Sequence, residues 1–299
     1  WLRALHVELM PALESDLSGL KEALHAVSAT GQLSPQMEDR IASHGEILSS
    51  QIFADRLSVL APTTHVDARL CLITDYNFGC AKPILAATAK AADAVLRPLI
   101  RAGHAVVMGG YVASTLSGET STLGRGGSDY SATLFASCLE AEEVEIWTDV
   151  DGMMTADPRV VEDAWTIRHI SFAEASELAY FGAKVLHPLT VLPAVESAIP
   201  VRILNSLRPE RKGTVISADA PAGESVVKSF AAKRGITAVT ITSSRMLMAH
   251  GFLRALFEVF DKHHVSIDVV TTSEVSVSLT TDNSAALEPV LKELASLGK

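Results

Sequence analysis

The first thirty residues carry apolar positions at helical spacing. From Leu2 to Val27 these positions fall three or four residues apart, which predicts either a pair of helices or one helix broken near Pro11. The same reasoning predicts helices over residues 34–60 and 84–102. The N-terminal part of the chain is therefore expected to be helical.

Short apolar runs alternate with helices farther along the chain. Strands are expected at residues 69–73, 105–109, 144–148 and 201–204. A helix that begins near Ser128 and others over about 172–197 separate them. Strands separated by helices are typical of an α/β fold, in which helices cover both faces of a mostly parallel sheet. Functional loops are expected at the carboxyl edge of that sheet.

A loop rich in Pro, Ala, Gly and Ser near residues 217–225 divides the sequence into two expected domains, 1–220 and 221–299. The second is expected to contain, in order, a strand at 236–242, a helix at 252–263, strands at 265–270 and 275–280, and a helix at 287–297. This β-α-β-β-α order predicts a small ferredoxin-like α+β module that is short of its final strand.

Composition narrows the classes of partner. Of the 299 residues, 48% are hydrophobic, enough to bury a sizeable core. The formal net charge of −10 argues against nucleic acid or an anionic membrane as the main partner. The three cysteines form no C-x-x-C pair or metal-ligand spacing, and no signal-peptide pattern or apolar run of about 18 residues occurs. We therefore expect a soluble cytoplasmic protein with no metal site of the Cys/His type.

The run TLGRGGSDYSATLFA at residues 122–136 places a glycine loop directly before an amphipathic helix. Glycines let backbone N–H groups converge on an oxyanion near the positive end of the helix dipole, and Arg125 adds a guanidinium fork. The pattern predicts an anion site. A surface turn capped by Ser128 or Asp129 is the alternative.

Four segments together resemble the aspartate kinases of the amino acid kinase family. They are GRGGSDYSA at 124–132, WTDVDGMMTADPR at 147–159, SFAEASELAYFGAKVLHP at 171–188 and, in support, SHGEILSS at 43–50. The resemblance implies the amino acid kinase fold and transfer of the γ-phosphoryl group of Mg-ATP to the side-chain carboxylate of L-aspartate. The product would be 4-phospho-L-aspartate, in the biosynthesis of lysine, threonine and methionine.

The resemblance also implies a substrate site around the glycine loop. Arg125 would pair with a carboxylate of aspartate, Asp129 would take its ammonium group, and both are expected to act in catalysis. The other substrate-binding residues implied are Glu46, Gly126 and Ser128. For Glu46 there is an alternative, because Ser43-x-x-Glu46 is itself a capping box at the start of a helix.

Nucleotide contacts are implied at the end of the strand at 144–148 and in the loop after it. The residues are Thr148, Asp149, Met154, Arg159 and Lys184, with Lys184 also catalytic. Met154 stands where relatives often carry an aromatic residue. Without the motifs around them, Lys184 would be interpreted as a solvated helix residue and Arg159 as a surface ion-pair partner. His187, Trp147 and Phe181 are interpreted as packing residues.

The segment at residues 246–280 resembles the ACT module that regulates aspartate kinases. The residues implied in effector binding are Met246, Gly251, Phe252, Leu253, Asp268, Ser273 and Glu274. The turn at 251–253 would receive an amino acid carboxylate, and two carboxylates near the ligand would favour lysine as a feedback inhibitor. A homodimer through ACT modules is expected. The alternative is a helix cap and a polar turn in a dimerisation module.

Two further functional hypotheses remain open at this level. One is another amino acid kinase, acting on glutamate or a nucleotide. The other is a non-catalytic amino acid sensor. It stays open because the Lys-x-Gly-Gly-Thr-Ser loop with which amino acid kinases begin is not found in the sequence. On the same ground, residues 1–299 alone are expected to show negligible turnover and to need an upstream segment.

Overall fold

The computed structural model describes residues 11–180, 190–220, 227–246, 250–282 and 286–298. The chain divides into two compact units, Trp1–Ala231 and Ala232–Lys299. This division falls after the expected boundary at residue 220, because residues 228–230 bond to the first unit. Lys228 pairs with Glu174 at 2.9 Å, and the backbone N–H of Phe230 donates to the carbonyl of Thr155 at 2.8 Å.

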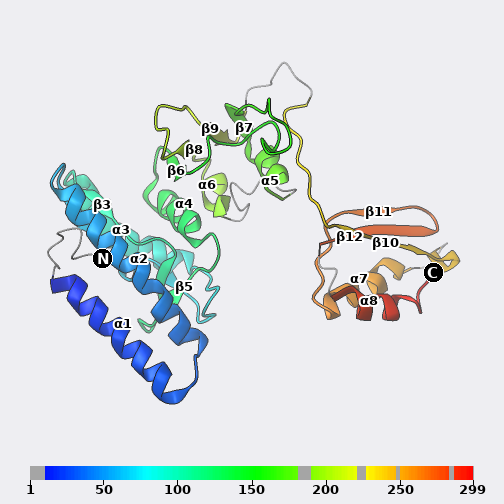
Figure 1. The fold of residues 1–299 in the computed structure, drawn as a ribbon, viewed down its shortest axis with the longest axis horizontal. Coiled ribbons are helices and arrows are strands. Elements are labelled where there is room, and N and C mark those ends of the chain that lie inside the picture. Colours follow the sequence, from blue (N-terminus) through cyan, green and yellow to red (C-terminus); the bar gives the residue numbers. More distant parts are fainter. Residues whose placement is uncertain (1–10, 181–189, 221–226, 247–249, 283–285, 299) are drawn as a thin grey trace. The chain divides into compact units, whose positions relative to one another are not determined.

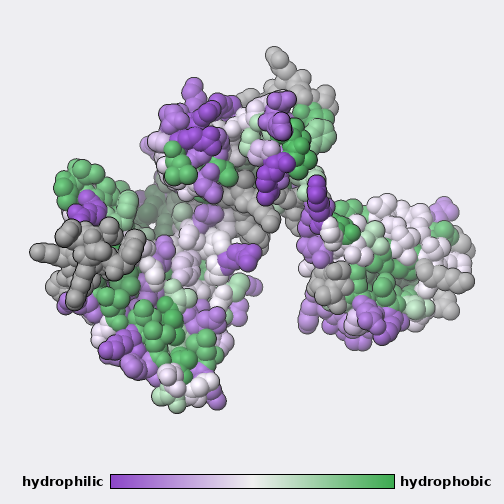
Figure 2. Space-filling model, viewed as in Figure 1, coloured by the Kyte–Doolittle hydropathy of each residue, from purple (hydrophilic) through white to green (hydrophobic). Residues whose placement is uncertain are grey.

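The first unit begins with two helices that pack side by side, α1 (Pro11–Thr30) and α2 (Pro35–Ser58) (Figure 1). Ser34 caps α2 by accepting a hydrogen bond from the N–H of Met37, and Pro35 follows at the first helical position. The predicted helix at 34–60 is confirmed. The part of the first predicted helix that precedes Pro11 lies outside the described residues. Apolar residues reach the surface of this hairpin (Figure 2), among them the exposed Leu24 and Phe53.

Two short sheets follow α2. Strand β1 (Thr63–His65) pairs in parallel with β3 (Ala105–Val107). Strand β2 (Ile73–Thr74) pairs in parallel with β4 (Val112–Thr115), which pairs antiparallel with β5 (Thr120–Thr122). The buried cluster beside them contains Val66, Cys71, Ala92 and Leu96. Ala92 and Leu96 come from helix α3 (Leu85–Arg101), which confirms the helix predicted at 84–102.

The strand predicted at 69–73 is largely wrong. Residues Ala68–Leu70 form a turn of 3₁₀ helix, η2, because the Asp67 carboxylate accepts a hydrogen bond from the N–H of Arg69 and caps it. Cys71 and Leu72 are fully buried, but this burial is not in a strand, which begins at Ile73.

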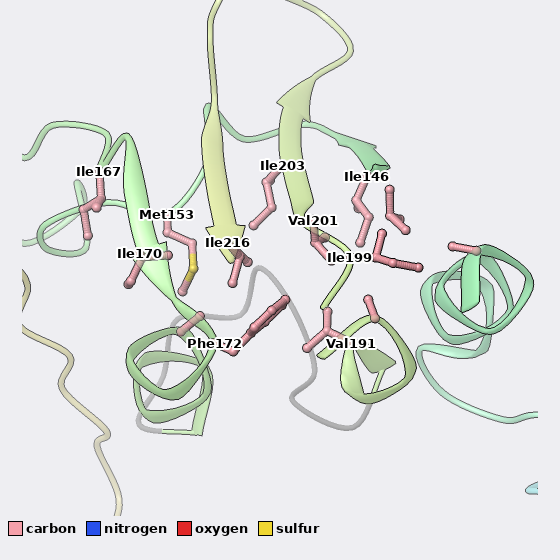
Figure 3. Close-up of a cluster of buried hydrophobic side chains, with 14 residues drawn as sticks. Ile146, Met153, Ile167, Ile170, Phe172, Val191, Ile199, Val201, Ile203 and Ile216 are labelled. Carbon is pink, nitrogen blue, oxygen red and sulfur yellow. The ribbon is translucent and has the colours of Figure 1, made fainter. Parts of the chain in front are cut away.

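Helix α4 (Gly127–Leu139) leads into the second part of the unit, a sheet of order β6-β8-β9-β7. Its strands are β6 (Val144–Thr148), β8 (Val201–Asn205), β9 (Thr214–Ser217) and β7 (His169–Ser171). Helices α5 (Phe172–Tyr180) and α6 (Leu192–Glu196) lie beside this sheet. Apolar side chains from the strands meet those of the helices in one buried cluster, where Ile170, Val201 and Ile216 are fully buried (Figure 3).

Four of the six strand pairings in the described part of the first unit are parallel. The expected mostly parallel α/β fold is confirmed. The strands form three short sheets, however, and not one.

The second unit contains β10 (Thr237–Thr242), η4 (Ser244–Met246), α7 (Phe252–Lys262), β11 (Val270–Thr272), β12 (Ser276–Thr281) and α8 (Leu287–Leu294). The sheet order is β10-β12-β11 with antiparallel pairing, and both helices cover one face (Figure 1). This confirms the β-α-β-β-α order. The predicted strand at 265–270 is wrong for its first five residues, because Val265 is buried against the helices, outside any strand.

Among the described residues, no helix combines the length and apolarity needed to cross a membrane.

Candidate active site

The glycine loop forms the turn that enters α4. Gly124 and Gly126 have positive φ angles of 74° and 75°, a conformation that side chains rarely adopt. A Cβ at Gly124 would also lie 2.8 Å from the carbonyl oxygen of Gly79, too close for any other residue. The sequence therefore specifies this turn through glycine.

A pocket of about 230 Å³ opens at this turn. Its lining residues are Tyr111, Gly124, Gly126, Gly127, Ser128 and Asp129. The first turn of a helix carries backbone N–H groups without intrahelical acceptors, and the helix dipole favours an anion there. The structure thus brings Gly126, Ser128 and Asp129 together at one pocket, as the sequence predicted.

Two charged side chains of opposite sign flank the turn. Arg125 is exposed, and within the described ranges its guanidinium has no ion-pair partner. Asp129 is half-buried, and burial raises the pKa of its carboxyl above the usual 3.8. Raising the pKa means that the charged form lacks compensation, so a cation that binds beside Asp129 would be stabilised. Asp129 lines the pocket, whereas Arg125 lies in the same turn but is not among the described residues that line it.

Glu46 reaches the pocket loops from α2. Its Oε1 accepts a hydrogen bond from the N–H of Gly110 at 3.1 Å. Gly110 in turn lies against Ser128, since a Cβ at Gly110 would lie 2.8 Å from the Ser128 Cβ. The capping alternative for Glu46 is wrong, because Ser43 lies inside α2 and donates to the carbonyl of Arg40.

The residues expected to contact nucleotide lie at and beyond the carboxyl end of β6. Thr148 ends this strand, and its hydroxyl donates to the Asp149 carboxylate at 3.2 Å. Strand β6 pairs in parallel with β8, so both carboxyl ends meet at one edge. Met154 is half-buried, and its carbonyl accepts a hydrogen bond from the Ser229 hydroxyl. An open edge of this kind is where α/β sheets bind nucleotides.

Two basic residues, Arg159 and Lys184, were expected to contact the phosphates of the nucleotide, and the structure describes only the first of them. Arg159 is exposed and pairs with Asp157 at 2.8 Å, which is the surface ion pair that the sequence also allowed. The hydrogen bonds that this guanidinium donates to the Asp157 carboxylate raise its pKa. Lys184 lies outside the described residues, as do His187 and Phe181.

The core placement expected of Trp147 is wrong. This side chain is 48% exposed, because β6 alternates and Trp147 lies on the face opposite the buried Ile146. The indole Nε1 donates to the Glu145 carboxylate at 3.0 Å.

A set of contacts that clamps the loop after β6 was missed by sequence reasoning. Asp151 accepts a hydrogen bond from the Asn205 amide at 2.7 Å and pairs with Arg208 at 3.0 Å. The backbone N–H of Ser206 donates to the carbonyl of Thr148 at 2.8 Å. These contacts hold the residues after β6 to those after β8. No local pattern links residues so far apart in the sequence.

The second unit has its own pocket, of about 310 Å³. The described residues that line it are Met246, His250, Gly251, Phe252, Leu253 and Arg254. Gly251 precedes α7 with a φ of 86°, so the predicted turn at a helix start is present. The pocket brings together four of the seven expected effector residues; Asp268, Ser273 and Glu274 are not among its described lining.

The other three expected effector residues have different surroundings. Asp268 is nearly buried and pairs with Lys233 at 3.3 Å. Ser273 and Glu274 lie in the exposed turn between β11 and β12, where the Ser273 hydroxyl accepts a hydrogen bond from the N–H of Ser276. The polar-turn alternative therefore describes the local geometry of Ser273.

The described residues contain no group of three or more His, Cys, Asp or Glu side chains suited to hold a metal ion. Magnesium in phosphoryl-transfer enzymes is bound mainly through substrate phosphates, with one or two carboxylates and water. Asp149, at the carboxyl end of β6, is the carboxylate expected beside a nucleotide.

A glycine turn at a helix N-terminus is suited to bind an anion, and an open edge of parallel strands is suited to bind a nucleotide. The model of the amino acid kinase family matches residues 9–205, and the chain belongs to that family.

Within the family, the chain is similar to aspartokinases. It is 43% identical over 262 residues to lysine-sensitive aspartokinase 3 of Escherichia coli strain K12, covering 87% of this chain and 58% of that protein. The structure of E. coli aspartokinase III in complex with aspartate and ADP matches with a TM-score of 0.78 and 40% identity, over 96% of this chain and 65% of that one. The structure of the same E. coli enzyme in complex with lysine and aspartate matches with a TM-score of 0.77 and 40% identity, again over 96% of this chain and 65% of that one.

The predicted resemblance to aspartate kinases is thus confirmed. The chain spans about half the length of the curated relatives it matches, 58%, 48% and 50% for the first three.

Proposed function

We propose that this chain serves an aspartate kinase, which transfers the γ-phosphoryl group of Mg-ATP to the side-chain carboxylate of L-aspartate. The product is 4-phospho-L-aspartate, a precursor of lysine, threonine and methionine. The observation that carries this proposal is the pocket at the start of α4, where Arg125 and Asp129 flank one glycine turn. The similar E. coli aspartokinase III was crystallised with aspartate and ADP.

The charge of Asp129, which lines the pocket, and that of Arg125 in the same turn match the charges of the substrate. Arg125 pairs with a carboxylate of aspartate, and Asp129 takes its ammonium group, with Glu46, Gly126 and Ser128 completing the contacts. This arrangement leaves the second carboxylate to face the nucleotide. A carboxylate is already a nucleophile, so the protein needs to supply position and charge neutralisation more than a general base.

The nucleotide is proposed to lie at the β6–β8 edge. Thr148 and Asp149 contact it there, Met154 packs beside it, and Arg159 and Lys184 supply positive charge. Arg159 would exchange Asp157 for a phosphate, which an exposed ion pair allows at little cost. Magnesium bound with ATP neutralises charge on the phosphates.

Regulation is proposed to belong to the second unit. Lysine would bind at the 246–254 pocket through the turn before α7, with Asp268, Ser273 and Glu274 as acceptors for ammonium groups. The structure of the similar E. coli enzyme with lysine and aspartate supports lysine as the effector. A homodimer formed through these units is proposed as the assembly.

The test is ADP release by the protein that contains this chain, measured with Mg-ATP and a panel of aspartate, glutamate and nucleoside monophosphates. Aspartate is expected to give the highest kcat/KM, and lysine to inhibit more strongly than threonine or methionine. Preference for glutamate or a nucleotide would make the protein another member of its family. Lysine binding by calorimetry without ADP release on any substrate would make it a sensor.

A further inference from the structure

A buried carboxylate on α2 joins two loops that border the glycine turn. Asp39 is 2% exposed. Its Oδ2 accepts hydrogen bonds from the backbone N–H groups of Gly79 and Thr122, each at 2.9 Å. Its Oδ1 accepts from the Thr122 hydroxyl at 2.7 Å. All three donors are uncharged.

Both loops held by Asp39 lie next to Gly124. Thr122 is the last residue of β5 and precedes Gly124 by two positions. Gly79 supplies the carbonyl oxygen that a Cβ at Gly124 would meet at 2.8 Å. The N–H of Ala81 also donates to the carbonyl of Thr122 at 2.9 Å, so the two loops are bonded to each other as well as to Asp39.

A buried carboxylate without a cationic partner is costly unless hydrogen bonds satisfy it. Here the bonds are short and directed at two segments that are distant in sequence from α2. An apolar residue at this position would pack, but it would not fix the distance between α2 and the turn. The geometry therefore favours a positional role for Asp39.

The same helix holds the other side of the pocket. Glu46, two turns after Asp39, binds the N–H of Gly110, and Gly110 lies against Ser128. Helix α2 thus contacts the loop before Arg125 through one carboxylate and the loop beside Ser128 through another.

We propose that Asp39 is a positioning residue for the aspartate pocket, which fixes the 122–124 segment and thereby the place of Arg125 without touching substrate. The inference rests on the proposed kinase function. It assigns Asp39 to the aspartate side of the reaction and not to the nucleotide side.

The test compares kinetic constants of Asp39→Asn with those of Glu38→Gln, an exposed neighbour on the same helix. Asparagine keeps the volume of Asp39 but removes its charge. Its NH2 group cannot accept a hydrogen bond, so at least one donor that faces Asp39 loses its acceptor. The KM for aspartate is expected to rise about tenfold, while the KM for ATP stays within about twofold. Glu38→Gln should leave both constants unchanged.

A second pair of variants does not depend on the folding of Asp39→Asn. Thr122→Val removes the hydroxyl that donates to Asp39 and should raise the KM for aspartate. Thr122→Ser keeps a hydroxyl and should leave this KM close to that of the unmutated protein. If Asp39 and Thr122 act together, the double variant Asp39→Asn/Thr122→Val should show less than the product of the single effects.

Two results would overturn the inference. One is an unchanged aspartate KM in folded Asp39→Asn and Thr122→Val. The other is an equal loss for aspartate and ATP together with a lowered melting temperature, which would make Asp39 a general structural residue. An unmutated protein that does not phosphorylate aspartate would instead refute the proposed function.

Discussion

At the scale of single residues, Arg125 is the most direct test of the substrate pocket. It is exposed beside the pocket, and the described part of the chain gives it no ion-pair partner, so its loss should disturb little else. We expect Arg125→Ala to raise the KM for aspartate about 10- to 100-fold, because a charge-assisted hydrogen bond is lost, with a much smaller change for ATP.

The matched control for this prediction is Arg101→Ala, at the exposed end of α3. Steady-state kinetics with circular dichroism of each variant would decide. Equal losses of aspartate and ATP binding in a folded variant would contradict the assignment of Arg125.

Asp129 gives a prediction about pH. Burial raises the pKa of its carboxyl above 3.8, so in the free protein it takes up a proton at a higher pH than an ordinary aspartate does. Aspartate binding needs the ionised form to hold the ammonium group. The affinity for aspartate should therefore fall as the pH drops through the raised pKa.

The stability of the fold depends on pH in the opposite direction to the affinity for aspartate. Because the folded protein binds this proton more tightly than the unfolded chain does, the contribution of Asp129 to folding is full below pH 3.8 and is lost as the pH rises through its raised pKa.

The variant Asp129→Asn tests the prediction about binding. It should weaken aspartate binding and abolish the rise of the KM for aspartate at low pH. An acid limb that persists unchanged in this variant would assign it to another group.

At the scale of elements, the clamp between β6 and β8 should matter for nucleotide binding. Asp151 contacts both Asn205 and Arg208, and removing its carboxylate leaves the buried Asn205 amide without that acceptor. We expect Asp151→Ala to raise the KM for ATP about 5- to 20-fold, with little change for aspartate.

The control is Asp163→Asn, an exposed carboxylate farther along the segment between β6 and β7. Both variants would be assayed at saturating aspartate while ATP is varied. If Asp151→Ala behaved like the control, the loop after β6 would not depend on the clamp for its conformation.

At the scale of the whole molecule, inhibition by lysine should depend on Asp268. This carboxylate pairs with Lys233, which also pairs with Asp282 at 2.9 Å, so an incoming ammonium group would compete with a lysine of the chain itself. We expect Asp268→Asn to weaken lysine inhibition at least tenfold while uninhibited turnover stays nearly unchanged, since the effector acts by shifting a conformational equilibrium.

Inhibition curves and calorimetry with lysine, threonine and methionine would measure this effect. Asp261→Asn, exposed on α7, is the control in the same unit. Tighter binding of threonine than lysine to the unmutated protein would contradict the proposed effector.

Sequence patterns succeeded where a structure depends on near neighbours. Helix α2 was predicted from the helical spacing of its apolar residues, and the structure adds a cap at Ser34 that acts within one turn. The same patterns failed at residues 265–269, because Val265 is buried without lying in a strand. They also failed at Trp147, which lies in a strand without being buried. Burial depends on what packs against a residue, which no local pattern records.

Strands β4, β5, β7 and β9 were not predicted. The sequence alone did determine helices α2, α3 and α4, the β-α-β-β-α order of the second unit, and the glycine turn with Arg125 and Asp129 beside it. Each follows from residue type and backbone conformation within a few positions. Only the tertiary structure decided that α2 holds both sides of the pocket. Its contacts join Asp39 to Thr122 and Glu46 to Gly110, across 83 and 64 positions, and hydrogen bonds of that span leave no periodic signal along the chain.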